Sequence, residues 1–440
     1  MSVDLKGKRL LVMDRTALAA CAVRRAKELG LYTIVANFYK TEDSPSKQIA
    51  DEAIEIDISN IDAMCDLIRE KKIDGIFVGW TDSHLPFYAQ ICEKMELPCC
   101  GTVEQFDILS NDKRRFKKLC LEYGVPVPQE YHLTMDFAKE DLAKIEYPVL
   151  VKPADESGSR GIKRCNNEQE LIENYTWLYN YSKSKKIFVE KYIESPCEVF
   201  LHYTVQDSVP SLSCGFIKQK IKSEGATASS AILHTFIDEN SRKYIDIYRK
   251  NTEESVLKLI EGIGLKNGPV MFQGFMKDEK FYFYESGLRM GGEQYYVFAS
   301  PLNGLSTLDL MIEFSVTGKM SSVKVAEKDN AVYSKSCVNY YITLKAGVIT
   351  QIKGIEEVEK MPQVLQNATF KAIGDEISAT NSLDRVIYRL HVMDDTPEAL
   401  AETLVKISNT LCITDSEGNE MQVERLTFER ALEMTSNSNI

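Results

Sequence analysis

The segment Tyr147-Pro-Val-Leu-Val-Lys152-Pro-Ala-Asp-Glu-Ser-Gly-Ser-Arg-Gly161-Ile162 decides the fold, because it joins a short apolar strand to a lysine and then to a loop of small residues. A buried strand fixes the stem of Lys152, and small loop residues let backbone N–H groups approach a polyphosphate. The loop is not a Walker A motif, since the chain has no Gly-Lys-Ser/Thr. Taken alone, a strand, a lysine and a loop also describe an ordinary turn.

A second group of polar side chains follows about 130 residues later, at Gln273, Glu285 and Arg289. Carboxylate and amide oxygens are ligands that Mg²⁺ accepts, and an arginine stabilises charge that develops during group transfer. A lysine strand with a small-residue loop, followed by such a group, indicates an ATP site.

The composition is that of a globular enzyme with several domains. The chain has 440 residues, of which 44% are apolar and 27% are charged, and this length exceeds what a single core supports. A formal net charge of −12 argues against nucleic acid or an anionic membrane as the main partner. No apolar run is long enough for a membrane span and no apolar signal core follows Met1, so we expect a cytoplasmic protein.

The cysteines favour the same compartment. There are eleven of them, an odd number, and no Cys-x-x-Cys spacing occurs. Most lie in apolar settings, as Cys21, Cys65, Cys92, Cys120 and Cys412 do. We therefore expect reduced core thiols rather than a zinc site.

The first hundred residues alternate between strand and helix patterns. Ile61, Met64, Cys65 and Ile68 recur at the i, i+3, i+4, i+7 spacing of an amphipathic helix. The alternation predicts a doubly wound parallel sheet. A dinucleotide cofactor is not expected, because Asp14-Arg15-Thr16 stands where the Rossmann glycines would follow the first strand. The other expected elements are the strands Arg9–Met13, Tyr32–Ala36 and Ile76–Trp80 and the helix Ala17–Leu29.

Later segments predict further elements. Asn111 or Asp112 is expected to cap a helix that runs to Tyr123. Gly225–Ser230 is expected to be a mobile loop and a candidate substrate lid, and the tail from Thr435 is expected to be disordered. The remaining expected elements are the strands Ile187–Ile193, Val338–Leu344, Gly347–Ile352 and Arg385–Val392 and the helix Pro397–Ser408.

These motifs in this order resemble the ATP-grasp superfamily of carboxylate–amine ligases, over roughly residues 5–430. The middle of the chain is most similar to the amino-acid ligase and carbamoyl-phosphate synthase large-subunit branches. Besides the lysine strand and its loop, the matching segments are Asn111–Phe116, Gly124–Pro128, Val189–Ile193 and Tyr284–Gly292.

The resemblance implies an α/β protein with the ATP-grasp fold. A doubly wound pre-ATP-grasp domain would occupy residues 1–108, the ATP-grasp domain residues 109–330, and a small β-rich α+β closing domain residues 331–440. The ATP-grasp domain would divide into a lysine and flap subdomain at 109–186 and a metal and catalytic subdomain at 187–330. The resemblance also favours a homodimer.

The resemblance assigns the ATP-binding residues by position. Lys113 and Lys152 would contact phosphate, and Glu198 would lie near the ribose hydroxyls. Backbone donors in the flap would come from Ser157, Gly158, Ser159 and Gly161. The hinge that reads adenine would include Glu190, Lys191 and Ile193.

It also assigns the reacting end of the site. Gln273 and Glu285 would hold Mg²⁺ or Mn²⁺, and Arg289, with Lys152, would be catalytic, the arginine stabilising the oxyanion of acyl transfer. Candidate substrate contacts are Gly291 and Gly292, whose backbone amides can reach the substrate, together with His234 and Asp82.

Two positions depart from the family pattern. Gln273 stands where the family has the first acid of its metal pair, and Gly287 stands where it often has Asn. An amide still offers one oxygen to Mg²⁺ but removes a negative charge, so the metal site is expected to be weaker. The departures keep open a nucleotide-binding protein without turnover.

Each candidate residue also has a purely structural interpretation. Lys152 can be a surface lysine with a buried stem, and Glu190 or Glu198 can pair with neighbouring cations on a sheet face. Arg289 can be an ion-pair partner of Glu285, and His234 can be a hydrogen-bonded strand histidine.

The resulting prediction is a ligase that uses ATP to phosphorylate a small carboxylate, an amino acid above all, and joins it to an amine with release of ADP and phosphate. The alternatives are an enzyme of the same fold that phosphorylates a carboxylate or carbamate, and a non-catalytic ATP-binding subunit. A biotin-dependent carboxylase is less favoured, because no bicarbonate signature or biotinyl-lysine domain is identified. The predicted partners are ATP and small-molecule substrates, without nucleic acid or membrane.

Overall fold

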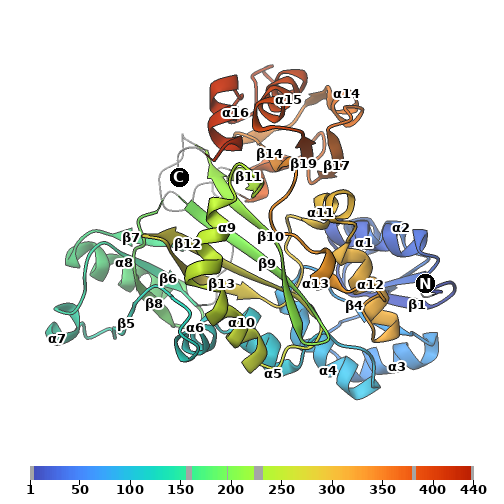
Figure 1. The fold of residues 1–440 in the computed structure, drawn as a ribbon, viewed down its shortest axis with the longest axis horizontal. Helices are drawn as coiled ribbons and strands as arrows, with labels where there is room; N and C mark the ends of the chain where they lie inside the picture. The colour runs from blue at the N-terminus through green and yellow to red at the C-terminus, as the bar shows by residue number, and fades with distance from the viewer. Residues whose placement is uncertain (1–3, 155–160, 196, 222–230, 379–382, 438–440) are drawn as a thin grey trace.

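The computed structural model describes residues 4–154, 161–195, 197–221, 231–378 and 383–437. Its amino-terminal sheet has four parallel strands in the order β3-β2-β1-β4, so the predicted doubly wound parallel sheet is confirmed (Figure 1). Helix α1 packs beside α2, and α3 packs beside α4. The strands are β1 (Arg9–Val12), β2 (Tyr32–Asn37), β3 (Glu52–Glu55) and β4 (Gly75–Phe77), and the helices are α1 (Ala17–Glu28), α2 (Pro45–Ile49), α3 (Ile61–Lys71), α4 (Leu85–Met95) and α5 (Val103–Phe106).

A smaller antiparallel sheet carries the lysine strand. Its order is β5-β8-β6-β7, and α8 packs against it on the left of Figure 1. Helix α6 begins at Lys113 because the Asp112 side chain accepts hydrogen bonds from the N–H groups of Arg114 and Arg115, as the capping pattern predicts. The elements are β5 (Glu130–Tyr131), β6 (Val149–Pro153), β7 (Lys163–Cys165), β8 (Ile187–Lys191), α6 (Lys113–Glu122), α7 (Lys139–Leu142) and α8 (Glu168–Tyr181).

An eight-stranded sheet occupies the centre of the molecule, in the order β13-β12-β9-β10-β11-β14-β19-β17. Strands β11 and β14 pair across it, so the strands after residue 330 continue the same sheet. Its strands are β9 (Cys197–Gln206), β10 (Val209–Lys220), β11 (Ala231–Phe236), β12 (Gly268–Lys277), β13 (Lys280–Gly287), β14 (Ser336–Thr343), β17 (Val364–Thr369) and β19 (Val386–Asp394). The helices that follow or precede these strands are α9 (Lys243–Asn251), α10 (Glu253–Gly262), α11 (Tyr296–Asn303), α12 (Thr307–Thr317) and α13 (Val325–Lys328).

Two expectations for the carboxy-terminal region are wrong. The single strand expected at Gly347–Ile352 is two short strands with different partners, because buried Ile349 turns inward between them. The predicted disorder of the tail is wrong for residues 435–437, since Asn437 is buried and accepts a hydrogen bond from Gln219, and residues 438–440 lie outside the described residues. The elements here are β15 (Gly347–Val348), β16 (Gln351–Lys353), α14 (Ile355–Glu359), β18 (Glu376–Ile377), α15 (Pro397–Thr410), β20 (Cys412–Thr414) and α16 (Phe428–Thr435).

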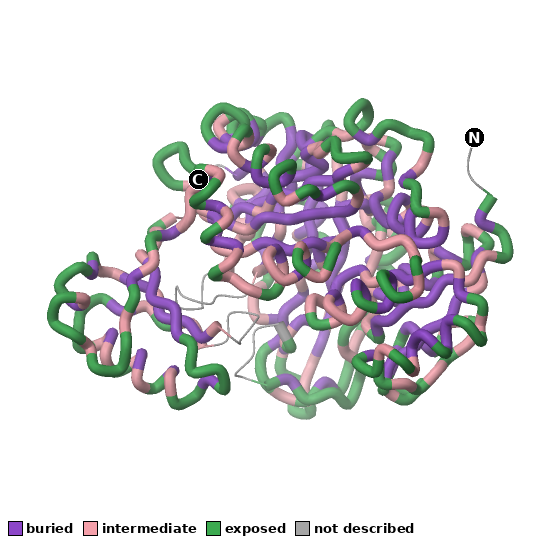
Figure 2. The backbone as a smooth tube through the Cα atoms, turned by 90° about the horizontal axis from the view of Figure 1, so that it is seen from below, coloured by how far each residue is buried: buried purple, intermediate pink, exposed green. Residues whose placement is uncertain are grey.

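One large apolar core joins the amino-terminal sheet to α6, α12 and the central strands. In Figure 2 the buried residues, in purple, are concentrated in the middle of the molecule. All eleven cysteines are free thiols, and eight are buried, in agreement with the expectation of reduced core cysteines. Among the described residues, no helix combines the length and the apolar character needed to cross a bilayer.

A chain of buried hydroxyl groups ends at one carboxyl group whose pKa is displaced. Thr204 Oγ1 lies 2.7 Å from Ser213 Oγ, and Ser213 donates to Asp329. Burial raises the pKa of Asp329 from 3.8 to about 6, although the bond from Ser213 lowers it. The protonated form is therefore favoured by folding.

We predict that Asp329→Asn stabilises the protein at pH 7.5 by on the order of 2 kcal/mol and leaves its stability unchanged below pH about 4. The sign follows because a raised carboxyl pKa contributes stability below the unfolded value and loses it as pH rises through about 6. Urea unfolding of both proteins between pH 4 and 8 checks this. A stability difference independent of pH would contradict it.

Candidate functional site

Lys152 and Glu190 lie on neighbouring antiparallel strands, β6 and β8. Leu150 is opposite Glu190, so Lys152, two residues further along the same face, reaches the carboxylate diagonally. Lys152 Nζ is 2.8 Å from Glu190 Oε2. Lys117, on α6, donates to the other oxygen, Oε1. All three side chains are buried, so Lys152 is not a surface lysine.

The charges of these groups depend on one another. Burial alone raises the pKa of Glu190, but Lys152 and Lys117 outweigh it and hold that pKa below its usual value. Burial lowers the pKa of Lys117, and Glu190 opposes that shift. A buried carboxylate between two ammonium groups is a stable arrangement, whereas the same carboxylate without a cation is not.

The rest of the predicted hinge and flap is placed only in part. Lys191 Nζ lies 3.2 Å from Glu146 Oε2, and the backbone N–H of Lys191 donates to the Gln129 carbonyl. Ile193 is half-buried. Gly161 has a φ of +73°, a left-handed value that glycine adopts without strain. Ser157, Gly158 and Ser159, and the predicted lid Gly225–Ser230, lie outside the described residues.

Glu198 has a similar environment on β9. Its carboxylate is buried, 3.6 Å from Lys218 Nζ and 3.4 Å from Lys220 Nζ, and accepts a hydrogen bond from the Tyr284 hydroxyl at 3.0 Å. Burial raises its pKa, and the two lysines outweigh that effect and lower it. The Tyr284 ring lies 6.0 Å from Lys152 Nζ, so this aromatic side chain connects the two carboxylate groups.

The predicted metal ligands are brought together by strand pairing. Gln273 and Glu285 are directly opposite each other on β12 and β13, which places their side chains on one face. Lys113 Nζ lies 3.4 Å from Glu285 Oε1, and the Gln273 amide oxygen accepts a hydrogen bond from Tyr284. One carboxylate and one amide suit Mg²⁺ if phosphate supplies further oxygens. Among the described residues, no group of three His, Cys, Asp or Glu side chains forms a metal site.

Arg289 is held by the amino-terminal region of the chain. Its Nε and Nη2 atoms donate to the two oxygens of Asp82 at 2.6 and 2.8 Å, a bidentate pair. The alternative that pairs Arg289 with Glu285 is therefore wrong. Burial lowers the pKa of Arg289, but Asp82 raises it further, so the guanidinium stays charged.

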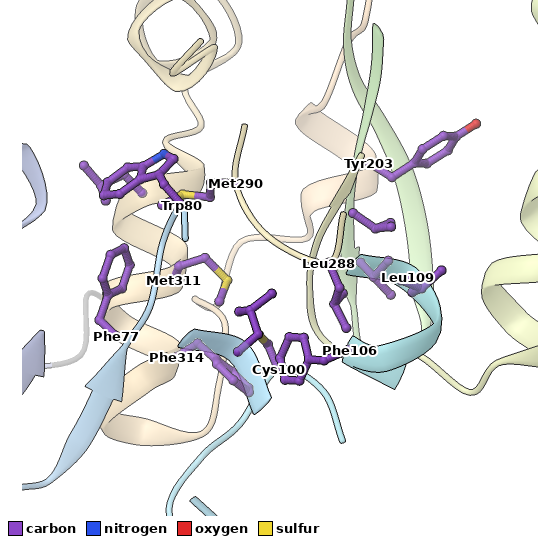
Figure 3. Close-up of a cluster of buried hydrophobic side chains, with 14 of the residues drawn as sticks. Phe77, Trp80, Cys100, Phe106, Leu109, Tyr203, Leu288, Met290, Met311 and Phe314 are labelled. Atoms are coloured by element: carbon purple, nitrogen blue, oxygen red, sulfur yellow. The ribbon is translucent and has the colours of Figure 1, made fainter. Parts of the chain in front are cut away.

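The chain around Arg289 is anchored by packing on both sides. In Figure 3, Leu288 lies beside Leu109 and Phe106, and Met290 lies beside Trp80. The predicted strand Ile76–Trp80 ends at Phe77, and the Trp80 indole instead donates to the Gly291 carbonyl at 3.2 Å. Rigid neighbours on both sides fix the direction of the guanidinium.

A buried carboxylate follows the two glycines. Glu293 Oε1 lies 2.9 Å from His202 Nε2. Burial raises the pKa of Glu293, but His202 and a backbone hydrogen bond together lower it to about 2. A Cβ at Gly291 would stand 1.8 Å from Glu293 Oε1, so the carboxylate fills the space that a side chain would need. A Cβ at Gly292 would meet only Leu18, at 3.8 Å.

We expect Gly291→Ala to reduce turnover about 100-fold, because it displaces Glu293 and shifts the loop beside Arg289. Gly292→Ala is the matched control and should keep turnover within about threefold, since its new methyl group makes an ordinary contact. Steady-state kinetics and melting temperatures of the two variants check this. Equal losses of turnover in Gly291→Ala and Gly292→Ala would contradict the conclusion that the Glu293 carboxylate fills the space beside Gly291.

His234 belongs to a polar cluster on the central sheet. Three of the five histidines, His202, His234 and His391, lie close to Glu293. His234 Nδ1 is 3.0 Å from the Tyr341 hydroxyl, and burial followed by Lys218 lowers its pKa to about 3, so the ring is neutral. It is a hydrogen-bonded strand histidine, and substrate contact by this residue stays a prediction.

Sequence reasoning missed several residues that the fold brings here. Lys117 follows Lys113 by one helical turn, and that i, i+4 spacing was a usable signal. Glu293 and His202 carried no signal, because tertiary packing brings the turn that holds Glu293 against distant β9, which carries His202.

The candidate site has more positively than negatively charged side chains, although the protein as a whole is acidic. Among the described residues, five lysines face three carboxylates there, and the neighbouring pair of Arg114 with Glu130 leaves this surplus unchanged, whereas the whole chain has a net charge of −12. The lysines are Lys113, Lys117, Lys152, Lys218 and Lys220, and the carboxylates are Glu190, Glu198 and Glu285. Such a surplus favours a polyanionic ligand.

Comparison with known proteins gives one family match and several similar proteins. The model described as "Carbamoyl-phosphate synthase L chain, ATP binding domain" matches residues 112–208. The 2-oxoglutarate carboxylase small subunit of Hydrogenobacter thermophilus is 32% identical over 208 residues, which cover 43% of this chain and 43% of that protein. The chain thus aligns with less than half of that relative's length.

Two solved structures are similar over nearly the whole chain. The L-amino acid ligase from Bacillus licheniformis has a TM-score of 0.74 at 18% identity, covering 93% of this chain and 99% of that one. The biotin carboxylase domain dimer of the Hydrogenobacter thermophilus 2-oxoglutarate carboxylase, solved with MgADP, ADP and bicarbonate, has a TM-score of 0.74 at 21% identity. That match covers 92% of this chain and 90% of the other.

Proposed function

We propose that this member of the ATP-grasp superfamily is a ligase that phosphorylates a small carboxylate with ATP and joins it to an amine. The observation that carries the proposal is the surplus of positive charge around Lys152, Glu198 and Glu285. A triphosphate is the ligand that such a surplus suits, and the ATP-grasp fold is the frame in which it occurs.

In this proposal the lysines bind and orient the triphosphate. Lys152 leaves Glu190 for phosphate, and Lys113 leaves Glu285, so that each gains a more highly charged partner. Glu285 and Gln273 would hold Mg²⁺ or Mn²⁺, and the ion would neutralise charge on the transferred phosphoryl group. Adenine lies at the hinge near Glu190 and Ile193, and the ribose lies near Glu198.

The reacting carboxylate lies beside Arg289 in this proposal. A fixed, buried guanidinium stabilises negative charge in the acyl phosphate and in the oxyanion formed when the amine attacks. The oxygen of the carboxylate attacks the γ-phosphorus and ADP leaves; the amine then attacks the acyl carbon and phosphate leaves. The amine site is formed by the cluster around Glu293, whose carboxylate suits an ammonium group before it loses its proton.

A second function is favoured by one comparison. The 32% identical relative is a carboxylase subunit, and the similar domain was solved with bicarbonate, so this chain would phosphorylate bicarbonate instead. The presence of Gln273 where the family has an acid favours a third function, in which the chain binds ATP without turnover. The homodimer stays part of the proposal.

The test is ¹⁸O transfer. The protein is supplied with MgATP, an amine pool and pools of small carboxylates labelled with ¹⁸O, and the phosphate released is examined by mass spectrometry. One ¹⁸O atom in phosphate from a labelled amino-acid pool supports the ligase. Label arriving only from bicarbonate supports the second function, and ATP binding without phosphate release, unchanged in Gln273→Glu, supports the third.

A further inference from the structure

Lys117 makes one contact that the ATP-site pattern does not assign. It lies on α6, its side chain is 5% exposed, and it donates to Glu190 Oε1 while Lys152 occupies Oε2 at 2.8 Å. One carboxylate therefore has a separate lysine on each oxygen. A single lysine would be enough to neutralise Glu190, so the second cation needs another explanation.

The surroundings do not cancel the extra charge. Glu130 Oε2 lies 3.9 Å from Lys117 Nζ, but Glu130 has its own cation, since Arg114 Nε lies 3.4 Å from its other oxygen. Lys117, Lys152 and Arg114 thus face Glu190 and Glu130, three cations against two carboxylates. Among the described residues, this group, in which Lys117, Lys152 and Glu190 are buried and Arg114 is exposed, has a surplus of one positive charge that suits an anion.

The two lysines differ in what they can do. Lys152 stands at the end of β6, where the flap begins, and belongs to the proposed phosphate contacts. Lys117 is buried on the helix whose first residue is Lys113, and it has contacts only with carboxylates and the Phe188 ring among the described partners. Lys152 therefore can leave Glu190, provided that another cation stays with the buried carboxylate.

We propose that Lys117 is a positioning residue that keeps Glu190 neutralised, so that Lys152 is free to bind nucleotide phosphate. The inference rests on the proposed ATP site. Without Lys117, Glu190 and Lys152 neutralise only each other. ATP binding must then separate this ion pair and leave the buried Glu190 carboxylate without a cation. With Lys117 present, Lys152 moves to phosphate at little electrostatic cost.

A double-mutant cycle tests this through ATP affinity. MgATP dissociation constants are measured by calorimetry for the wild type, Lys117→Met, Glu190→Gln and the double variant. Lys117→Met should weaken binding at least about 10-fold, whereas the same substitution in the Glu190→Gln background should change it less than about threefold, because the neutral amide no longer holds Lys152. Lys117→Arg keeps the charge and should stay within about threefold of the wild type.

The outcomes separate the inference from the proposed function. Equal losses from Lys117→Met in both backgrounds would mean that Lys117 acts through packing alone, and the inference would be wrong. Loss of affinity in Lys117→Arg equal to that in Lys117→Met would contradict it in the same way. If Lys117→Met does not fold, the Glu190→Gln background still tests the inference, because a loss of MgATP affinity there of more than about threefold would contradict it. A wild type that binds no MgATP would overturn the proposed function and this inference with it.

Discussion

Lys152→Met is expected to weaken MgATP binding about 100-fold and to remove measurable turnover, the largest effect that the site predicts. The variant loses the cation at the end of β6 that would contact phosphate. It should still fold, because Lys117 remains to neutralise buried Glu190, and methionine has nearly the length of lysine. Calorimetry with MgATP checks the expected loss of affinity, and thermal unfolding of the free protein checks that the variant still folds.

Lys144→Met is the matched control. This lysine lies in the same part of the chain, pairs with Asp141, and has a side chain that is 69% exposed. Its replacement should change neither affinity nor turnover beyond about twofold, since exposed pairs contribute little. If Lys152→Met binds MgATP as tightly as the control does, the lysine strand is not the nucleotide site.

Arg289→Lys should lower kcat/KM by about 100- to 1,000-fold while MgATP affinity stays within about threefold. Lysine keeps the positive charge but not the planar fork that holds both oxygens of Asp82 at 2.6 and 2.8 Å. The loss should fall mainly on kcat, because the lost contact is made where charge develops in the reaction. Steady-state kinetics with the identified substrates check it.

Arg25→Lys controls for the loss of a bidentate pair as such. Arg25 also joins the amino-terminal region to a later helix, donating to both oxygens of Asp309 at 2.8 and 2.7 Å. The two variants lose the same kind of long-range contact between the amino-terminal region and a later segment, but only Arg289 lies at the proposed reacting end. Comparable losses of kcat in both would indicate that Arg289 supports packing between these segments instead of chemistry.

Local signals in the sequence predicted local structure well. The Asp112 cap, the helix beginning at Ala17 and the lysine strand followed from patterns within a few residues. Gln273 and Glu285 were also grouped in advance, because the resemblance to ATP-grasp proteins assigned them one role, and the pairing of β12 with β13 places them opposite each other.

Contacts between distant segments were not predictable in the same way. Asp82 and Arg289 are 207 residues apart, and the bidentate pair between them depends on tertiary packing that brings the segment after β4 beside the segment after β13. The pairing of Glu190 with Lys117 depends on the position of α6 over β8. The order of the tail was missed because burial of Asn437 against Gln219 outweighs a polar sequence that favours disorder.

The most direct test of the account is release of phosphate from MgATP by the wild type, with pools of amino acids and small carboxylates supplied together with an amine. The account predicts release that requires one carboxylate pool and the amine, yields ADP and phosphate in equal amounts, and disappears in Lys152→Met. Release that needs neither pool, or formation of AMP and pyrophosphate in place of ADP and phosphate, would contradict it.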